Sequence, residues 1–152
     1  MYKIGVISDT HGLLREEVIK ELENCQLILH AGDINKLEVI ERLEAIAPLK
    51  VVRGNNDKGE WAEQLPESLL FTVAGKRFFM VHNKKDLLKD GTGIDVIVYG
   101  HSHKYYYAFE EGVHILNPGS CGKRRFDQAI TMAIMTIEEG KIEVKQVELS
   151  HS

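Results

Sequence analysis

Short apolar runs and helical apolar patterns alternate through the first sixty positions of the chain. Three β-branched runs bounded by polar residues predict buried strands: 4–8, 25–33 and 49–57. Two segments between them carry apolar residues at helical spacing and predict helices: 13–24 and 36–46. Pro48 directly follows the second helical pattern and ends it. This order of elements predicts a parallel sheet with right-handed crossovers.

The second half of the chain has the pattern of strands joined by tight turns. A hairpin is predicted over 69–82, turning at 74–76, and a buried strand over 95–100. Further strands follow, joined by Glu-Gly turns, over 104–117, 129–140 and 141–149. The segment 84–91 predicts at most a short helix. We expect this half to be mostly antiparallel and to form a second sheet, packed face to face with the first, with helices outside.

Composition and charge narrow the class of protein. The 152 residues predict one domain, 1–152, with a sizeable core. The formal net charge of −4 argues against a broad nucleic-acid-binding surface, although a bound metal would bring positive charge to a small anionic substrate. Cys25 and Cys121 form no CxxC pair, no signal-peptide pattern is present, and no apolar run approaches the roughly 20 residues that span a bilayer. We therefore expect a reduced, cytoplasmic protein without a membrane partner.

Polar side chains follow five of the predicted strands at the point where each strand ends. Ligands of α/β sheets bind at the carboxyl ends of the strands, so we expect these five ends to meet at one crevice. Glycine precedes several of the polar residues and allows the backbone to turn sharply there. The crevice would gather seven side chains: Asp9, His11, Asp33, Asn55, His82, His101 and His103.

These side chains are carboxylate, amide and imidazole donors, with no thiolate that would select a soft metal. They suit Mn²⁺, Ni²⁺, Fe or Zn²⁺, and we expect Mn²⁺ first. Seven donors exceed one tetrahedral site and suit two ions about 3.5–4 Å apart that share a carboxylate. Singly, each motif has an ordinary explanation, such as a turn at 55–57 or a structural histidine at His82. The ordered set, with each member after an apolar strand, favours a metal site.

The motifs Asp9-x-His11, Gly32-Asp33, Gly54-Asn55, His82 and Gly100-His101-x-His103 resemble the ordered blocks of the calcineurin-like metallophosphoesterase superfamily. The short chain and Asn117-Pro118-Gly119-Ser120 resemble its small YfcE-like phosphodiesterase branch. The resemblance runs from Tyr2 to about Leu149. It implies an α/β fold of the four-layer sandwich type, in which two mixed β-sheets are flanked by helices.

The resemblance also implies a division of the ligands between two divalent cations. One ion would be held by Asp9, His11, Asp33 and His103, and the other by Asp33, Asn55, His82 and His101, so that Asp33 bridges them. The implied activity is that of a dinuclear metal-dependent phosphoesterase, with a phosphodiester as the expected substrate. A hydroxide bridging the metals would attack phosphorus in line with the leaving alkoxide, without a covalent intermediate.

The sequence departs from the superfamily pattern in three places. Asn56 stands where many members have a histidine that protonates the leaving group, and an amide is no general acid near neutral pH. Asn83 follows His82 where glycine is usual, so its side chain would crowd the crevice or touch the substrate. Arg124 and Arg125, after the Asn117–Ser120 motif, are candidates to meet a phosphate, although a solvated loop explains them equally well.

Two classes of function stay open. An enzyme needs the whole ligand set, whereas a scaffold such as the retromer subunit that shares this fold does not. The complete set in this sequence favours the enzyme, with a scaffold or interaction module as the alternative. The sequence leaves several substrates open: cyclic nucleotides, RNA 2′,3′-ends, dinucleotides, phospholipid-derived diesters and phosphomonoesters. The aromatic segment 104–109 predicts either a contact between copies in a homo-oligomer or a strand packed on its own core.

Overall fold

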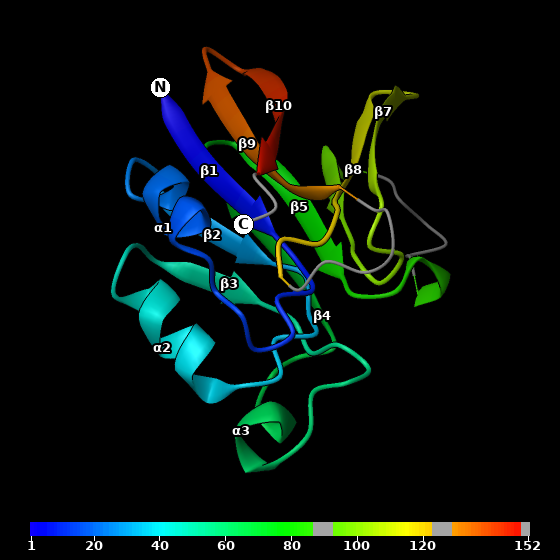
Figure 1. Ribbon diagram of the computed structural model, residues 1–152. Helices are drawn as coiled ribbons and strands as arrows, with labels where there is room; N and C mark the ends of the chain where they lie inside the picture. Colours follow the sequence, from blue (N-terminus) through cyan, green and yellow to red (C-terminus); the bar gives the residue numbers. More distant parts are fainter. Residues whose placement is uncertain (87–92, 123–128, 150–152) are drawn as a thin grey trace.

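The computed structural model describes residues 1–86, 93–122 and 129–149, and these form two mixed five-stranded sheets (Figure 1). The first sheet has the order β10 (Lys141–Leu149), β9 (Ile130–Glu138), β1 (Tyr2–Ile7), β2 (Leu27–His30) and β3 (Leu49–Val51). The second has the order β4 (Ser68–Val73), β5 (Lys76–Val81), β6 (Val96–Val98), β8 (Val113–Pro118) and β7 (Tyr105–Glu110). The predicted α/β fold with two mixed sheets is confirmed.

The helices are short, and the first two lie within the predicted helical segments, whereas α3 was not predicted. They are α1 (Glu16–Leu22), α2 (Leu37–Glu44), α3 (Glu60–Glu63) and the 3₁₀ turn η1 (Lys84–Asp86). The buried residues Val18 and Leu22 of α1 and Leu43 of α2 pack with Ile28 of β2 in one core cluster. These two helices therefore cover the outer face of the first sheet (Figure 1). None of the helices among the described residues has the length and apolar character needed to cross a membrane.

A second core cluster fills the space between the sheets. Val6 of β1 and Leu29 of β2 pack in the same cluster as Phe78 of β5 and Val98 of β6. The cluster also includes buried side chains of β9. Among its buried side chains from β1, β5, β6 and β9, all but one are fully shielded from solvent. Burial of this much apolar side chain is the main stabilising contribution to the sandwich. It also holds the carboxyl ends of β1, β2, β5 and β6 at one end of the molecule.

The expected division into two sheets at the middle of the chain was wrong, whereas the second half is mostly antiparallel, as expected, apart from the centre of the second sheet. Strands β9 and β10 join the first sheet, with β9 pairing antiparallel to β1, so the sheets do not divide at the middle of the chain. The centre of the second sheet is parallel, because β6 pairs parallel with both β5 and β8. The physical reason for the first difference is visible in β9, whose first six residues are all buried, as expected for an interior strand covered on both faces.

Candidate metal centre

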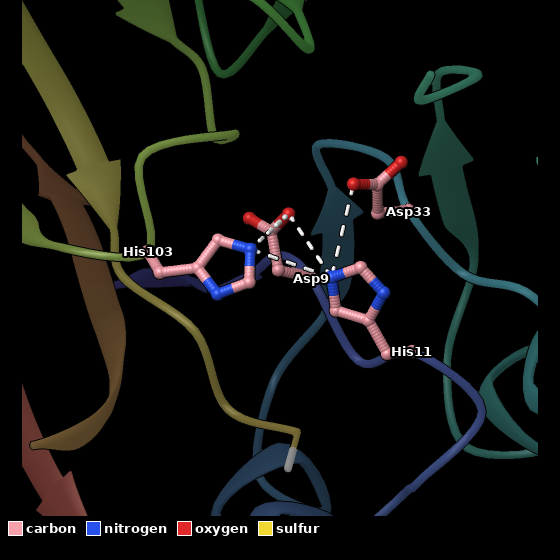
Figure 2. Close-up of side chains that lie close together, drawn as sticks. All are labelled: Asp9, His11, Asp33 and His103. Carbon is pink, nitrogen blue, oxygen red and sulfur yellow. Dashed lines mark hydrogen bonds and ion pairs between the residues drawn. The ribbon is translucent and has the colours of Figure 1, made fainter. Parts of the chain in front are cut away.

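The seven candidate ligands lie in the segments that follow five strands of the two sheets. Asp9 and His11 follow β1, Asp33 follows β2, Asn55 follows β3, His82 follows β5, and His101 and His103 follow β6. Their donor atoms fall into two groups at the shared end of the sheets. Figure 2 shows the first group, in which the side chains of Asp9, His11, Asp33 and His103 point toward one another.

The first group comprises one donor atom from each of these four residues, all within 4.8 Å of one another. His103 Nε2 lies 3.4 Å from Asp9 Oδ1, and His11 Nε2 lies 3.7 Å from Asp33 Oδ2 (Figure 2). The two imidazoles face each other, with their Nε2 atoms 3.4 Å apart. Three elements that are distant in the sequence thus supply one cluster.

The second group comprises Asp33, His82 and His101, again with donor atoms within 4.8 Å. His82 Nε2 lies 3.2 Å from Asp33 Oδ2. Asn55 extends this group, because its Oδ1 lies 3.2 Å from His101 Nδ1. Asp33 is the member common to both groups, and the division of these residues between two cations stays a prediction.

The donor set fits a pair of cations. Donor atoms around one tetrahedral ion, each about 2.1 Å from it, lie about 3.4 Å apart, close to the separations found in both groups. Asp9 Oδ1 and His82 Nε2 are buried without a hydrogen-bond partner among the described residues. A buried polar atom left unpaired costs free energy, and a cation would relieve that cost at both atoms.

The backbone of this site is held in a sparsely populated conformation. Five of the seven candidates have positive φ: Asp9 at 55°, His11 at 47°, Asp33 at 60°, His101 at 73° and His103 at 64°. Each such residue costs of order 1 kcal/mol or more and persists only when its surroundings enforce it. The fold therefore holds these side chains in place at the expense of stability, as is common at functional sites.

Hydrogen bonds aim individual donor atoms into the site. His82 Nδ1 donates to the carbonyl oxygen of Ala31 across 2.7 Å, which leaves Nε2 directed toward Asp33. Ser8 Oγ donates to Asp9 Oδ2 across 2.7 Å, and the backbone N–H of His101 donates to the same oxygen across 3.2 Å. These bonds occupy Oδ2 and leave Oδ1 of Asp9 facing the other ligands.

The electrostatic environment favours ionised carboxylate and charged imidazole. Burial alone would raise the pKa of Asp33, but its contact with His82 and the N–H of Asn56 hold that pKa well below its usual value. Burial alone would lower the pKa of His82, but the carboxylates of Asp33 and Asp9 raise it. The lowered pKa of Asp33 reflects the hydrogen-bond donors and imidazoles around it, and the raised pKa of His82 reflects the negative charge of the two carboxylates, which a cation would also complement.

Asp57 organises the site, and sequence reasoning missed it. Its buried carboxylate accepts four backbone N–H groups, from Asp33 (3.0 Å), Ile34 (2.8 Å), Asn35 (2.7 Å) and Gly54 (2.9 Å). A Cβ on Gly54 would meet the backbone nitrogen and carboxylate of Asp33 far inside contact distance, so only glycine fits there. The sequence contained one signal for this role, namely an acidic residue at the end of the run 54–57.

Asn117 is a second positioning residue. Its Nδ2 donates to the carbonyl oxygen of Gly100 (3.2 Å) and to Ser102 Oγ (3.0 Å), and its Oδ1 accepts the N–H of Gly119 (2.9 Å). These bonds fix the loop that carries His101 and His103. The Asn117–Ser120 motif that the sequence singled out therefore lies beneath this loop.

The other residues that the sequence singled out are Asn56, Asn83, Arg124 and Arg125, and they differ in their positions relative to the donor groups. Asn56 donates to Asp33 twice, from its backbone N–H to Oδ1 (2.9 Å) and from Nδ2 to Oδ2 (3.2 Å). Asn83 borders two hollows, one of about 560 Å³ that also contacts Asn55 and His82, and one of about 370 Å³ that also contacts His101. Arg124 and Arg125 lie outside the described residues, so their predicted phosphate contact stays a prediction.

Known proteins of one family resemble this chain over most of its length. The model of the calcineurin-like phosphoesterase superfamily domain matches residues 2–140. The chain is 34% identical over 131 residues to a probable metallophosphoesterase of Methanothermobacter thermautotrophicus, covering 77% of this chain and 76% of that protein. It is 33% identical over 153 residues to the probable metallophosphoesterase YsnB of Bacillus subtilis, covering 92% and 87%.

Solved structures with this architecture include a phosphodiesterase and several Vps29 proteins. An archaeal phosphodiesterase superposes with a TM-score of 0.82 at 28% identity, covering 97% of this chain and 99% of that one. Vps29 of Chaetomium thermophilum superposes with a TM-score of 0.77 at 18% identity, covering 98% and 97%. The second likeness shows the fold alone.

Proposed function

The chain belongs to the calcineurin-like phosphoesterase superfamily, and we propose that it is a phosphodiesterase that uses two divalent cations sharing the carboxylate of Asp33. The observation that carries the proposal is the meeting of two donor groups at this one residue. One cation is held by Asp9, His11, Asp33 and His103. The other is held by Asp33, Asn55, His82 and His101.

A cation pair in such a site supplies an activated water and positive charge against the oxygens of a phosphoryl group. The chain's own residues prepare this chemistry. Asp9 and Asp33 offset the repulsion between two cations, and the hydrogen bond to Ala31 keeps His82 in the tautomer that binds through Nε2. Asp57 and Asn117 hold the ligand loops before any cation arrives, so little reorganisation is needed on binding.

The surroundings of the site support a diester in preference to a monoester. A diester carries an organic group on each of two phosphorus–oxygen bonds, and Asn83 borders two hollows. Arg53 and Lys58 line the larger hollow, while Tyr99 and Tyr105 line the smaller one. We assign Asn83 to contact with the substrate between them, since an amide can both donate and accept a hydrogen bond.

Mixed carboxylate, amide and imidazole donors suit Mn²⁺, Ni²⁺, Fe and Zn²⁺. Of these metals we propose Mn²⁺ first, with the other three as alternatives. Cys25 and Cys121 are both free thiols, which supports a cytoplasmic location.

The alternative is a scaffold of the same fold with weak or no catalysis. It is favoured by the structural likeness to Vps29, including a Vps29 of Entamoeba histolytica described as a complex with Zn²⁺, at a TM-score of 0.73 and 19% identity. A metal site alone therefore does not distinguish an enzyme from a scaffold. Hydrolysis of a phosphate ester distinguishes them.

The test is a hydrolysis assay on demetallated chain reloaded with each metal in turn. Bis(p-nitrophenyl) phosphate reports diesterase activity and p-nitrophenyl phosphate reports monoesterase activity, with Asp33→Asn as the inactive control. We expect faster hydrolysis of the diester and none by the control. A chain that binds metal but hydrolyses neither ester would favour the scaffold.

A further inference from the structure

Strand β7 forms one edge of the second sheet (Figure 1). Within the described ranges its single strand partner is β8, paired from Tyr105 opposite Pro118 to Glu110 opposite Val113. No strand in the described part of the chain pairs with the backbone N–H and C=O groups on its other side, which are thus open to another strand.

The exposed edge of β7 lacks the usual protection against such pairing. The segment 105–109 contains no charge and no proline. Tyr106, Tyr107 and Phe109 are 44%, 36% and 60% exposed, and they make up half of the large exposed apolar side chains in the described part of the chain. By contrast β10, an edge of the first sheet, alternates lysine and glutamate over its first five residues. Charged edges resist association, so β7 is better suited to a partner than β10.

We propose that β7 pairs antiparallel with β7 of a second copy of this chain, joining two five-stranded sheets into one across a two-fold axis at Tyr107. Charge complementarity selects this partner. The uncharged run is closed by Lys104 on one side and Glu110 on the other, so its ends carry opposite charges. Reversing the direction of an identical strand brings each end against its opposite.

The register follows from the geometry of a symmetric antiparallel pair. Residues directly opposite each other point to the same face of the sheet, so the axis must pass beside a single residue. An axis at Tyr107 sets Lys104 opposite the partner's Glu110. An axis at Tyr106 would set Lys104 opposite an alanine, and an axis at Ala108 would set Tyr105 opposite a glutamate.

The other pairs in this register are also complementary. Tyr106 meets the partner's Ala108, a large side chain beside a small one. Tyr105 meets the partner's Phe109, and Tyr107 meets its own copy. Aromatic and opposite-charge pairs across strands each contribute roughly 0.2–1 kcal/mol, and symmetry makes every pair except the central one occur twice.

This dimer does not rest on the proposed function, although Tyr105 of β7 lines the smaller hollow beside the donor groups. Strand β7 begins two residues after His103, and none of its residues belongs to either donor group. A chain without catalysis would still dimerise through this edge, and a monomeric chain would still bind metal.

The test is sedimentation equilibrium of the full chain from micromolar to submillimolar concentration. We expect a monomer–dimer equilibrium. Lys104→Glu and Glu110→Lys should each raise the dissociation constant by at least about tenfold, since each places like charges opposite one another twice. The double variant K104E/E110K restores both pairs and should return the constant to within about threefold of the wild type.

Glu38→Lys, which makes the same charge change on the exposed side of α2, is the matched control and should leave the constant unchanged. Thermal unfolding of each variant shows that it is folded. The proposal is overturned if the wild type is a monomer at every concentration. It is also overturned if the single reversals leave the dimer intact, or if the double variant is no better than the singles, since either result would place the contact on another surface.

Discussion

Asp57 Oδ2 accepts the backbone N–H of Asp33 across 3.0 Å, so a carboxylate that follows β3 fixes the position of the carboxylate that follows β2. The same Asp57 oxygen accepts the N–H of Gly54 across 2.9 Å. One buried side chain thus joins the two loops that carry Asp33 and Asn55. The hydrogen bonds of Asp57 consequently fix the relative positions of Asp33 and Asn55 in the folded chain without a cation.

Replacing Asp57 by Ala should destabilise the protein and weaken metal binding together. Four backbone N–H groups would lose their acceptor, and hydrogen bonds to charged groups contribute about 1.5–3 kcal/mol each without being additive. We expect a loss of about 3 kcal/mol in the free energy of unfolding, measured by urea denaturation of the metal-free chain.

Asp95→Ala is the control for this change, because Asp95 Oδ2 accepts a backbone N–H from Arg77 across 2.8 Å far from the donor groups. Its loss should be about 1 kcal/mol with unchanged metal content. Equal losses in the two variants would contradict the organising role of Asp57.

Replacing Asp33 by Asn should impair the site more than replacing Asn55 by Ala. Asp33 belongs to both donor groups, whereas Asn55 contacts one member of the second group, His101. Asp33→Asn should lower bound metal by both equivalents, and Asn55→Ala by no more than one, as measured by elemental analysis after gel filtration. Near-normal metal content and rate in Asp33→Asn would show that this carboxylate does not bridge.

The positions of the donor residues were predictable from the sequence because two local signals coincide. Asp9 and Asp33 each follow an apolar run that had to be buried, and parallel strands bring such ends to one edge of a sheet. The hydrophobic pattern therefore located the site without any knowledge of which strands pair. His101 and His103 illustrate this, since they follow β6 in the other sheet and still reach the same cluster.

Strand pairing and the supporting residues were not predictable in this way. The run that forms β9 has the same apolar character as one that would lie in the second sheet, and only contacts with β1 decide between them. Asp57 and Asn117 act through bonds to the backbone of distant loops. Their side-chain types are ordinary for turns, so the sequence alone contains no sign of these partners.

Metal should stabilise the folded chain as well as activate it. A ligand at about 100 times its dissociation constant adds roughly 2.7 kcal/mol to the free energy of unfolding if only the folded state binds it. We expect Mn²⁺ to raise the melting temperature and a chelator to reverse the rise, measured by calorimetry, while Asp33→Asn should show no rise. Full hydrolytic activity in thoroughly demetallated chain would refute the two-cation proposal.

The thiols should be unreactive in the native state. Burial raises the pKa of Cys121 to about 12, and burial also raises the pKa of Cys25. The thiolate is the reactive form, so a raised pKa lowers its population at every pH below that value. We expect a thiol reagent at pH 8 to label the native chain slowly and the urea-unfolded chain at both positions. Rapid labelling of Cys121 in folded protein would contradict its burial.

The side chain of Asn56 predicts how the enzyme depends on its leaving group. Its Nδ2 donates to Asp33 Oδ2, so the amide is engaged with a proposed metal ligand, and it has no proton to transfer near neutral pH. The rate should therefore fall steeply as the pKa of the leaving alcohol rises. Nitrophenolate is a stable anion and should leave readily, whereas an alkoxide should leave slowly.

Asn56→His tests this reading, because an imidazole at that position could protonate the departing oxygen. General acid catalysis is typically worth about 10²–10⁴-fold, or roughly 3–5 kcal/mol of barrier. The variant should accelerate alkyl diesters more than nitrophenyl diesters and so flatten the dependence on leaving-group pKa. The measurement is a series of diesters with graded leaving groups, hydrolysed by wild type and variant, with Asn56→Gln as the control that keeps the amide. If the wild type already shows a flat dependence while chemistry limits the rate, another group supplies the proton, and Asn56 acts only through its hydrogen bonds to Asp33.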